Sequence, residues 1–582
     1  MNAQSEKAGA GKSGMRDSGM ISDHPVSPQL ERTSSLAWWI GMALVILFFL
    51  VLKMFTLNPY ASDEYIYIYQ GKLIAEGLVP YKDFSMAHPP LQALFTAGLI
   101  KVFGYDFLVF RMLGTFWALL AGIVLGFVVK REWGSVAAVS SSALYLLAYE
   151  PLRASIHFTG VNMTIALLML TLLAFRRKNM MACSLFGAMA VFTRLYALPA
   201  MLALFIVHFV NDRKGALRLA AYGFGIGAVF FILLGAWSGF NAMMNDILLF
   251  QAQKTAMQED RLSFMRDAVL FHNAVPFILF IVGAATLIAM YFNEAAGTAA
   301  SGKREKKKGR LKKDYSLLWT AFLSVLLILG ILLNMDRVWM YYFVLAFPFA
   351  AILGGWMISN WVQNRKAVFL MGKTEGAVTS LRPVWWTGTL VVFVAFYFIS
   401  PRLEKRLDYY RQAMRDPAKR TANYTWHDGK LPSGVNQLVK SLFWQDTRII
   451  GETYSSFTYY LWHCSRIIDI AFEIAEEIRQ RAKEGDRIFG DSGTVPLMAL
   501  LTGLNIAGNE VDTNVERYRS GNADPRTLIQ KIEVPSTRFL LLRDKFGVSV
   551  LPEIQNLLGR NYREVKSWKS KTGFTIRLFE RR

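Results

Sequence analysis

The sequence predicts a polytopic α-helical membrane protein with a C-terminal extracytoplasmic α/β domain. Its 582 residues are 53% apolar and 14% aromatic, and the mean hydropathy is +0.28. Apolar runs long enough to cross a bilayer recur along residues 36–400, whereas residues 401–582 are polar and alternate between strand-like and helix-like patterns. Several membrane spans followed by alternating strands and helices therefore predict this fold class.

The N-terminal residues 1–35 are polar and rich in Gly, Ser, Lys and Asp, which predicts a disordered cytoplasmic tail. The apolar run 36–57 is long for a signal-peptide core and lacks a small-residue cleavage site, so we expect an uncleaved anchor. About eleven spans are expected by length and hydropathy. They lie near residues 36–57, 108–130, 133–150, 154–175, 180–193, 195–210, 217–238, 274–293, 315–334, 338–362 and 384–400. Residues 91–104 are apolar but too short to cross, which predicts an interfacial helix.

The positive charges give the orientation. The net charge is +22, and basic residues gather in alternate loops, above all in KREKKKGRLKK at 303–313. A nucleic-acid patch is one interpretation of such a run, but basic cytoplasmic loops are the ordinary one in a membrane protein. With the N-terminus inside, the loops 58–107 and 239–273 and the C-terminal domain face outward. We therefore expect a multi-pass protein of the cell (inner) membrane that does not bind nucleic acid.

The outward C-terminal part, residues 401–582, reads as a linker followed by a small soluble α/β domain of two or three layers. Within it, GDSGT at 490–494 precedes a helix and is either a tight structural turn or a weak phosphate cradle. Cys183 and Cys464 fall in different regions, so no disulfide framework or cysteine-based zinc site is expected.

The first outer loop concentrates ionisable residues. Ser62 can cap a helix whose first turn holds Asp63 and Glu64, and the positive end of that helix favours ionised carboxylates. Asp63 is then available as a base, although Asp and Glu at a helix start are also ordinary capping residues. The loop continues with PYKDF and HPPL, where prolines fix the backbone close to the lipid surface. Polar groups are costly this close to the lipid, so their presence here indicates a functional role.

At this loop the sequence resembles a known family. DEYIYIYQGKLIAEGLVPYKDF followed by HPPL is similar to the first outer loop of polyprenyl-phosphate-sugar-dependent glycosyltransferases of the GT-C fold. This group contains protein O-mannosyltransferases and lipid A aminoarabinose transferases. Four further segments follow in the same order as in the family: DFLVFRMLGTFWALLAGIVLG, VFTRLYALPAML, RVWMYYFVLAFPFAAILGG and FGDSGTVPLMALLTGLNIAGNEVDTNVERYRSG. The resemblance spans most of residues 58–580.

The resemblance implies an integral-membrane, inverting glycosyltransferase. Such an enzyme moves a sugar from a polyprenyl phosphate to an acceptor hydroxyl on the outer face of the membrane, and the acceptor is a glycan, a lipid or a protein. It implies Asp63 as the base beside the acceptor, with Glu64 tuning Asp63 or orienting the acceptor. The identities of the sugar, a hexose or a pentose, and of the acceptor stay open.

A phosphate leaving group needs cationic or hydroxyl partners near the outer interface. The candidates are Lys72, Lys82, Arg153, Arg194, Arg337, Tyr341 and Tyr342. Each also has an ordinary interpretation, because basic side chains at span ends reach toward lipid headgroups and tyrosines form interfacial belts. Arg111, inside the second span, is either a phosphate contact or an ion-pair partner.

His88 and Asp83 are candidates for orienting the donor or the acceptor. His88 together with Asp63 or Glu64 also offers ligands to a divalent metal, but a His before two prolines can equally shape the loop through hydrogen bonds. No cofactor other than such a metal is expected. The second outer loop, within 239–273, predicts either a lid or a plain interfacial helix.

Two other function classes fit a chain with many spans. A transporter or lipid-linked-sugar flippase would show internal repeats or ionisable groups at mid-bilayer, and neither is evident in the sequence. A non-catalytic assembly scaffold would use the C-terminal domain as a platform for partners. Consumption of a polyprenyl-phosphate sugar distinguishes an enzyme from both.

Overall fold

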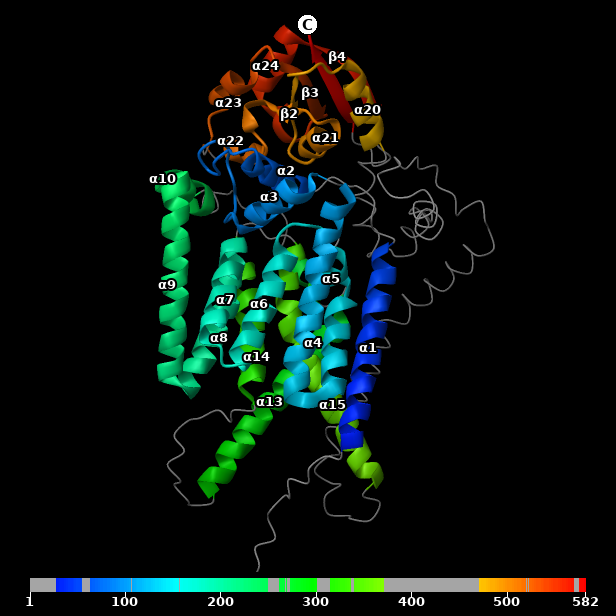
Figure 1. Cartoon of the computed structure of the whole chain (residues 1–582), viewed down its shortest axis with the longest axis vertical. Coiled ribbons are helices and arrows are strands. Elements are labelled where there is room, and N and C mark those ends of the chain that lie inside the picture. The colour runs from blue at the N-terminus through cyan, green and yellow to red at the C-terminus, as the bar shows by residue number, and fades with distance from the viewer. Residues whose placement is uncertain are drawn as a thin grey trace, which may run out of the picture.

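The computed structural model has two tiers, a helical bundle and an α/β domain, with the first outer loop between them (Figure 1). It describes residues 28–54, 63–105, 107–155, 157–249, 261–266, 268–269, 273–300, 315–335, 340–370, 470–519, 521, 523–569 and 575–582. The expected span at 384–400, the basic run at 303–313 and Cys464 lie outside these residues.

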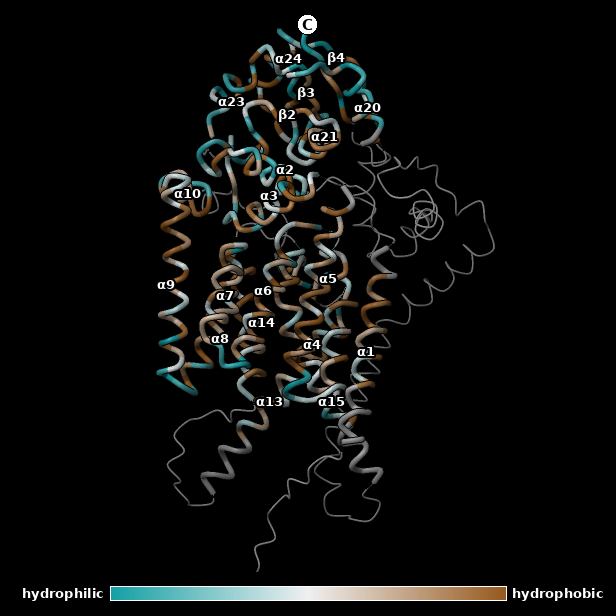
Figure 2. Tube along the Cα trace, viewed as in Figure 1, coloured by the Kyte–Doolittle hydropathy of each residue, from teal (hydrophilic) through white to brown (hydrophobic). Residues whose placement is uncertain are grey.

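The bundle consists of mostly apolar helices (Figures 1 and 2). Five described helices are long and apolar enough to cross a membrane, and shorter apolar helices stand beside them. The five lie in α4 (Phe107–Leu146), α9 (Arg213–Ser238), α13 (Ala274–Ala300), α14 (Ser316–Asn334) and α15 (Phe347–Leu370). The shorter apolar stretches lie in α1 (Pro28–Met54), α6 (Val161–Arg176), α7 (Met180–Thr193) and α8 (Leu198–Asn211). The predicted multi-pass membrane architecture is confirmed. The first helix begins at Pro28, inside the stretch predicted as a polar tail.

Helix α4 is two antiparallel arms under one label. Gly134 has a left-handed φ of 80°, which glycine adopts without a Cβ penalty, and the chain reverses there. The hydroxyl of Ser142 donates to the carbonyl of Gly122 at 2.9 Å, so residues on either side of Gly134 lie side by side. The separate spans predicted at 108–130 and 133–150 correspond to these two arms.

Short elements connect the bundle to the upper tier. They are α5 (Tyr149–Ala154), η1 (Leu195–Ala197), α10 (Phe240–Met244), the π-helix η2 (Asn245–Leu249), α12 (Arg261–Arg266) and η5 (Met340–Ala346). The last of these leads directly into α15, the most buried of the candidate spans.

The first outer loop forms a layer between bundle and domain. Its helices are α2 (Glu64–Ala75) and α3 (Leu91–Phe103), and α3 matches the short helix predicted at 91–104. Most of α2 is buried because the C-terminal domain covers it. The hydroxyl of Tyr69 accepts the amide hydrogen of Ile506 at 2.9 Å, and the ammonium of Lys72 donates to Asn505 Oδ1 at 2.9 Å. The aromatic residues of this loop therefore pack against protein on both sides.

The C-terminal domain is a three-layer α/β structure with a five-stranded sheet of order β2-β1-β3-β5-β4. The strands β1 (Arg487–Gly490), β2 (Asn505–Ile506) and β3 (Thr537–Arg543) are parallel. Strand β5 (Thr575–Arg581) pairs antiparallel with β3, and β4 (Tyr562–Lys569) pairs antiparallel with β5. The helices are α20 (Ala471–Arg481), α21 (Val495–Thr502), α22 (Val515–Arg519), α23 (Pro525–Ile532) and α24 (Pro552–Asn561), with short turns η7 (Ala507–Asn509) and η8 (Gly547–Val550). The α/β fold predicted for this part of the chain is confirmed.

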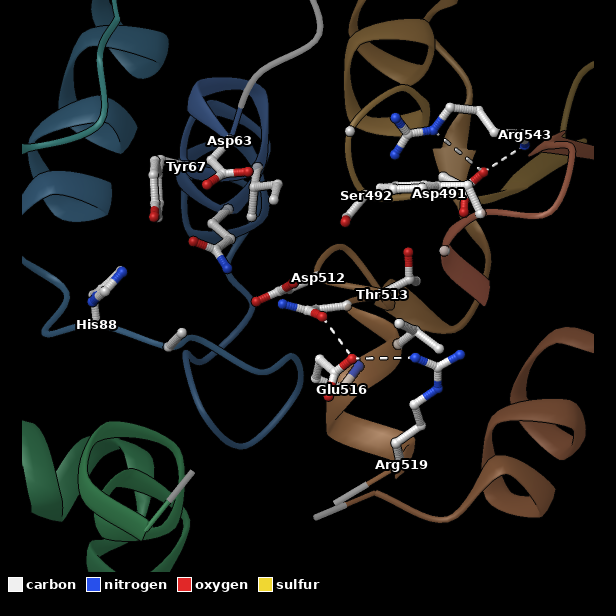
Figure 3. Close-up of a pocket in the computed structure, with 18 of the residues that line it drawn as sticks. Asp63, Tyr67, His88, Asp491, Ser492, Asp512, Thr513, Glu516, Arg519 and Arg543 are labelled. Carbon is white, nitrogen blue, oxygen red and sulfur yellow. Dashed lines mark hydrogen bonds and ion pairs between the residues drawn. The ribbon is translucent and has the colours of Figure 1, made fainter. Parts of the chain in front are cut away.

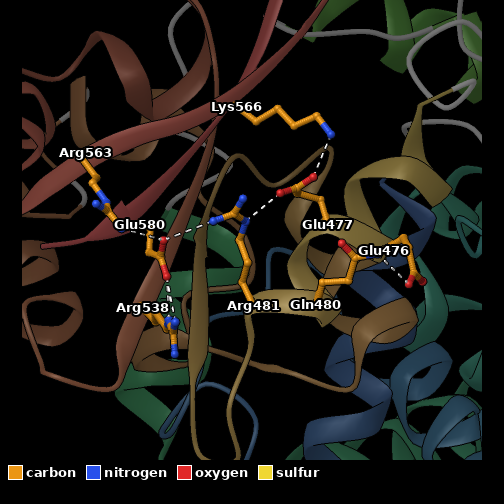
Figure 4. A network of polar contacts seen from close by, with 8 residues as sticks. All are labelled: Glu476, Glu477, Gln480, Arg481, Arg538, Arg563, Lys566 and Glu580. Atoms are coloured by element: carbon orange, nitrogen blue, oxygen red, sulfur yellow. Dashed lines mark hydrogen bonds and ion pairs between the residues drawn. The ribbon is translucent and has the colours of Figure 1, made fainter.

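Alternation along β3 fixes the layers. Phe539 and Leu541 point to the face covered by α20 and α21, and this core is continuous with the bundle core. Leu540 and Leu542 point to the opposite face, where α23 and α24 cover them. A network of charged residues joins α20 to strands β3, β4 and β5 of the sheet (Figure 4). Glu477 accepts from Arg481 at 2.6 Å and from Lys566 at 2.7 Å.

Candidate functional site

A cavity of about 700 Å³ lies where the two tiers meet. One wall, here called the membrane-side wall, comes from the first outer loop, α2 and η5. The other, the domain-side wall, comes from the loops after β1, β2 and β3. Figure 3 shows Asp63, Tyr67 and His88 on one side, facing Ser492, Asp512 and the residues around them on the other.

Asp63 is the exposed acid of the membrane-side wall. It occupies the N-cap position of α2, and its carbonyl accepts the amide hydrogens of Ile66 at 3.1 Å and Tyr67 at 3.3 Å. Its side chain does not cap the helix and lines the cavity. The N-terminal end of α2 is the positive end of the helix dipole, which favours an ionised carboxylate there.

Glu64 is placed differently from its neighbour. It is 1% exposed and lies outside the cavity lining, and its carboxylate accepts the amide hydrogen of Phe158 at 3.0 Å. The adjacent carboxylates predicted as a catalytic pair are thus separated by orientation: Asp63 faces the cavity, and Glu64 ties α2 to the segment before α6.

Arg194 lies behind the cavity wall and not in it. Its guanidinium is 2% exposed, donates to Gln92 Oε1 at 3.2 Å and to the carbonyl of Thr159, and lies 4.6 Å from the centre of the Tyr67 ring. Burial raises the pKa of the Tyr67 hydroxyl above its ordinary value, and Asp63 and Asp512 add to the increase while Arg194 opposes it. Tyr67 is therefore a neutral hydroxyl within electrostatic reach of both walls.

The predicted tyrosines gather beside Asp63. Tyr341 and Tyr342 both line the cavity, and their hydroxyl oxygens are 3.4 Å apart. Tyr196 joins them, with its ring centroid 4.8 Å from that of Tyr342. Residues far apart in the sequence thus place several phenol groups around one carboxylate.

The other predicted residues of the first loop divide in two. His88 lines the cavity, and its ring lies 5.9 Å from that of Tyr67. Lys72 points away, toward Glu76 at 2.9 Å and Asn505. Lys82 is exposed outside the lining, and Asp83 closes a turn by accepting the amide hydrogen of Val79 at 2.7 Å.

Three further candidates cannot be placed. Arg337 lies outside the described residues, as do the side chains of Arg153 and Arg111. Their roles remain predictions. A divalent metal also stays a prediction: His88 and Asp63 share the cavity, but within the described ranges no group of three His, Cys, Asp or Glu residues is arranged to hold a metal ion.

The domain-side wall begins at the end of β1, with the GDSGT turn. Gly490 has φ 153°, and a Cβ there would lie 1.8 Å from the carbonyl oxygen of Leu541, so only glycine fits. Asp491 is 1% exposed and accepts the amide hydrogens of Arg543 at 2.6 Å and Val548 at 3.2 Å. Burial raises its pKa to about 6, against the effect of Arg543, whose guanidinium Nε is 3.9 Å away. The turn is thus structurally braced while Ser492 and Gly493 line the cavity.

A clasp built on Asp246 holds the two walls together. One oxygen of Asp246, in η2, accepts the amide hydrogen of Met86 at 2.9 Å, and the other lies 3.5 Å from the guanidinium of Arg517 in α22. Arg517 also donates to the hydroxyl of Ser85. The second outer loop, predicted as a lid or an interfacial helix, therefore supplies a contact that joins the first loop to the C-terminal domain.

Of the domain-side wall, the sequence singled out only the GDSGT turn, which contains Asp491. Asp512, Glu516 and Arg543 stand in ordinary loop and strand-end contexts, and only the fold brings them opposite Asp63. The available signal was topological, because ligands of open α/β sheets bind beyond the carboxyl ends of parallel strands. GDSGT follows the first such strand.

A helical bundle crowned by a three-layer α/β domain, with a cavity between them, is the GT-C-type architecture that the sequence resemblance predicted. The chain superposes on ArnT from Cupriavidus metallidurans in the apo state with a TM-score of 0.55 at 15% identity, covering 94% of this chain and 98% of that one. For the same protein bound to undecaprenyl phosphate, the TM-score is 0.52 at 14% identity, covering 93% and 98%. No family model and no curated protein matches the sequence. The likeness to solved structures establishes the fold.

Proposed function

We propose that this chain is an integral-membrane, inverting glycosyltransferase that moves a sugar from a polyprenyl-phosphate donor to an acceptor hydroxyl on the outer face of the membrane. The observation that carries the proposal is the placement of Asp63. An exposed carboxylate at a helix N-terminus lines a cavity of about 700 Å³ directly above an apolar bundle. There it can meet a lipid-borne donor from below and a polar acceptor from above.

An apolar groove supports a lipidic donor. It has a volume of about 380 Å³, is lined by Leu326, Leu327, Gly330 and Ile331 of α14, and shares Asn334 and Met335 with the cavity. A hydrocarbon chain lying along this groove stays in the apolar layer of the membrane and packs against α14, while its phosphate end reaches the cavity. The solved ArnT structure of the same fold that holds undecaprenyl phosphate supports a polyprenyl-phosphate donor.

The geometry then suggests one displacement step. Asp63 accepts the proton of the acceptor hydroxyl as the acceptor oxygen bonds to the anomeric carbon. The bond from that carbon to the phosphate oxygen breaks on the opposite face, so the sugar is inverted and polyprenyl phosphate leaves with the bonding electrons. Because an aspartate is a weak base toward a free alcohol, proton transfer comes late, once the acceptor oxygen has begun to bond.

The surrounding side chains orient the reactants. The hydroxyls of Tyr67, Tyr341 and Tyr342 are positioned to donate to the donor phosphate or sugar, and His88 stands on the same wall. Arg194 acts through Tyr67, whose ring it holds. Arg153 and Arg337 remain our proposed cationic partners of the phosphate.

The test is Asp63→Asn in the full chain reconstituted with a polyprenyl-phosphate sugar. We expect sugar transfer to fall on the order of a thousandfold or more, since the base is removed, with normal insertion and Tm. Glu76→Gln, at the exposed C-terminal end of the same helix, is the matched control and should keep full turnover. Near-normal turnover in Asp63→Asn would remove Asp63 as the base.

A further inference from the structure

The C-terminal domain has a topological switch point that opens into the cavity. From β1 the chain passes through α21, on one face of the sheet, to β2; it then returns through α22 and α23 to β3 on the other side of β1. The connections that leave the carboxyl ends of the neighbouring strands β1 and β3 go to opposite faces of the sheet, to α21 and to α24. Such a divergence opens a crevice between the two strand ends, where open α/β sheets bind ligands. Here β1 ends at Gly490, and the residues just beyond it line the cavity opposite Asp63.

The loops at this crevice are fixed in place. The hydroxyl of Thr513 donates to the carbonyl of Gly490 at 2.7 Å, which pins the loop carrying Asp512 to the end of β1. The loop after β3 is pressed against Asp491, because a Cβ on Gly547 would lie 2.0 Å from the Asp491 carboxylate. Asp512 and Phe546 therefore come from braced backbone, as binding side chains require.

The side chains at the crevice suit a polyhydroxylated ring. Ser492, Asp512 and Glu516 offer hydroxyl and carboxylate groups, and Phe546 places a 47% exposed ring on the same wall. The guanidinium of Arg543 covers one side of that ring, 3.9 Å from its centre. A pyranose has hydroxyls that both donate and accept along its edge and apolar C–H groups on its face, so it can use the polar groups and the ring together.

The charges at this wall do not suit a second phosphate. The carboxylate of Glu516 lies 3.4 Å from the guanidinium of Arg519, and Asp491 lies beside Arg543, so both arginines of the wall are paired with carboxylates, and Lys545 is the remaining cation of its lining. Asp512 adds another negative charge facing the cavity. An anion placed here would be repelled by these carboxylates, whereas the hydroxyls of a neutral saccharide can donate hydrogen bonds to them.

We infer that this crevice is the acceptor subsite and that it takes a saccharide ring, so that the acceptor is the sugar part of a glycan or glycolipid. The inference rests on the proposed glycosyl transfer and adds the acceptor's chemical class. Asp512 bonds ring hydroxyls, Phe546 covers the ring's C–H face, and the acceptor hydroxyl points across the cavity toward Asp63.

The first experiment measures binding without turnover. The full chain in nanodiscs, with no donor present, is mixed with total envelope extract of the organism that carries it, and backbone hydrogen exchange is followed. The extract is used untreated, after protease digestion, and after periodate oxidation, which cleaves the vicinal diols of sugars. We expect residues 512–519 and 544–550 to exchange several times more slowly with the untreated and protease-digested extracts, and the effect to vanish with the oxidised one.

Two variants tie the protection to the named side chains. Asp512→Asn and Phe546→Ala should each raise the KM for the extract about tenfold, with the KM for the donor unchanged, because each removes one contact to the acceptor only. Glu484→Gln, an exposed residue away from the cavity, is the control and should change neither constant.

The outcomes separate the inference from the proposed function. Protection that survives periodate and is lost on protease digestion would make the acceptor a peptide, and absence of protection with every extract would remove the crevice as the acceptor subsite. Either result overturns the inference while donor consumption continues. Periodate-sensitive protection in a chain that never consumes a polyprenyl-phosphate sugar would instead overturn the glycosyltransferase and leave a saccharide-binding crevice.

Discussion

The two walls of the cavity are held by different forces. On the membrane-side wall, Asp63 stands on a buried helix that is kept in place by aromatic packing, by the buried Arg194 and by the buried Glu64, which bonds the Phe158 amide. On the domain-side wall, carboxylates pair with arginines that are partly exposed, and burial raises the pKa of Asp491. The first wall should therefore respond strongly to the loss of buried groups, whereas the second should respond to pH and to salt.

The largest loss of stability is expected from Arg194→Ala on the membrane-side wall. The Gln92 and Thr159 oxygens would lose a charged donor in a buried place, and the Tyr67 ring would lose its partner. The free energy of unfolding should fall on the order of 3 kcal/mol, because buried acceptors left without a donor carry their full desolvation cost. Thermal unfolding of the full chain in detergent measures it.

The control for Arg194 separates packing from donor binding. Arg194→Lys keeps the charge but loses the flat guanidinium that lies over the Tyr67 ring, so its Tm should lie between those of the wild type and the alanine variant. If Arg194→Ala kept the wild-type Tm and lost only affinity for the polyprenyl-phosphate sugar, Arg194 would contact the phosphate directly and our description of the membrane-side wall would be wrong.

The clasp between the walls should give the next largest effect. Asp246→Asn weakens the pair with Arg517, whose side chain is 12% exposed, and weakens the bond to the Met86 amide. We expect docking of the C-terminal domain to lose about 1–2 kcal/mol, more than an exposed pair contributes and less than a fully buried one. Limited proteolysis of the outer loops should accelerate accordingly.

A double-mutant cycle checks that the clasp acts as a pair. Asp246→Asn and Arg517→Gln together should cost clearly less than the sum of the single changes, because each single change already removes the same contact. Strict additivity would mean that Asp246 acts on Met86 alone and that the second outer loop does not hold the domain.

The membrane-side wall could be predicted from the sequence because its signal is local. Asp63, His88, Tyr341 and Tyr342 stand next to apolar runs, where polar groups are costly and therefore conspicuous. The resemblance gave Asp63 and Glu64 different roles, but the direction of each side chain depends on the fold, which turns Asp63 to the cavity and Glu64 to the Phe158 amide.

The domain-side wall could not be predicted residue by residue. Its strands and helices follow from periodicity, since β3 alternates between two cores. The approach of Asp512 to Asp63, however, depends on the clasp at Asp246 and on how the domain docks onto α2, and docking geometry leaves no periodic trace in a sequence. Lys72 illustrates the limit: it was predicted as a phosphate ligand and instead bonds Asn505 in the docked domain.

The pH response of the domain-side wall centres on Asp491. Burial raises its pKa from 3.8 to about 6, so the folded state binds this proton more tightly than the unfolded state does. The contribution is fully present below pH 3.8 and is lost as the pH rises through about 6, which means that ionisation of Asp491 lowers the domain's stability in that window. Asp491→Asn should flatten this segment of the Tm-against-pH curve, while Asp524→Asn, an exposed helix cap of the same domain, should keep its slope. An unchanged curve in Asp491→Asn would assign the slope to other carboxylates.

The smallest effect is expected where the two tiers meet at the surface. Lys72 pairs with Glu76, whose side chain is 42% exposed, and donates to Asn505 across the interface. Because water competes for exposed ion pairs, Lys72→Ala should lower stability by less than about 1 kcal/mol and leave the KM for the polyprenyl-phosphate sugar unchanged. A marked rise of that KM at constant Tm would return Lys72 to the phosphate site, because its flexible side chain would then have left Asn505 to contact the donor.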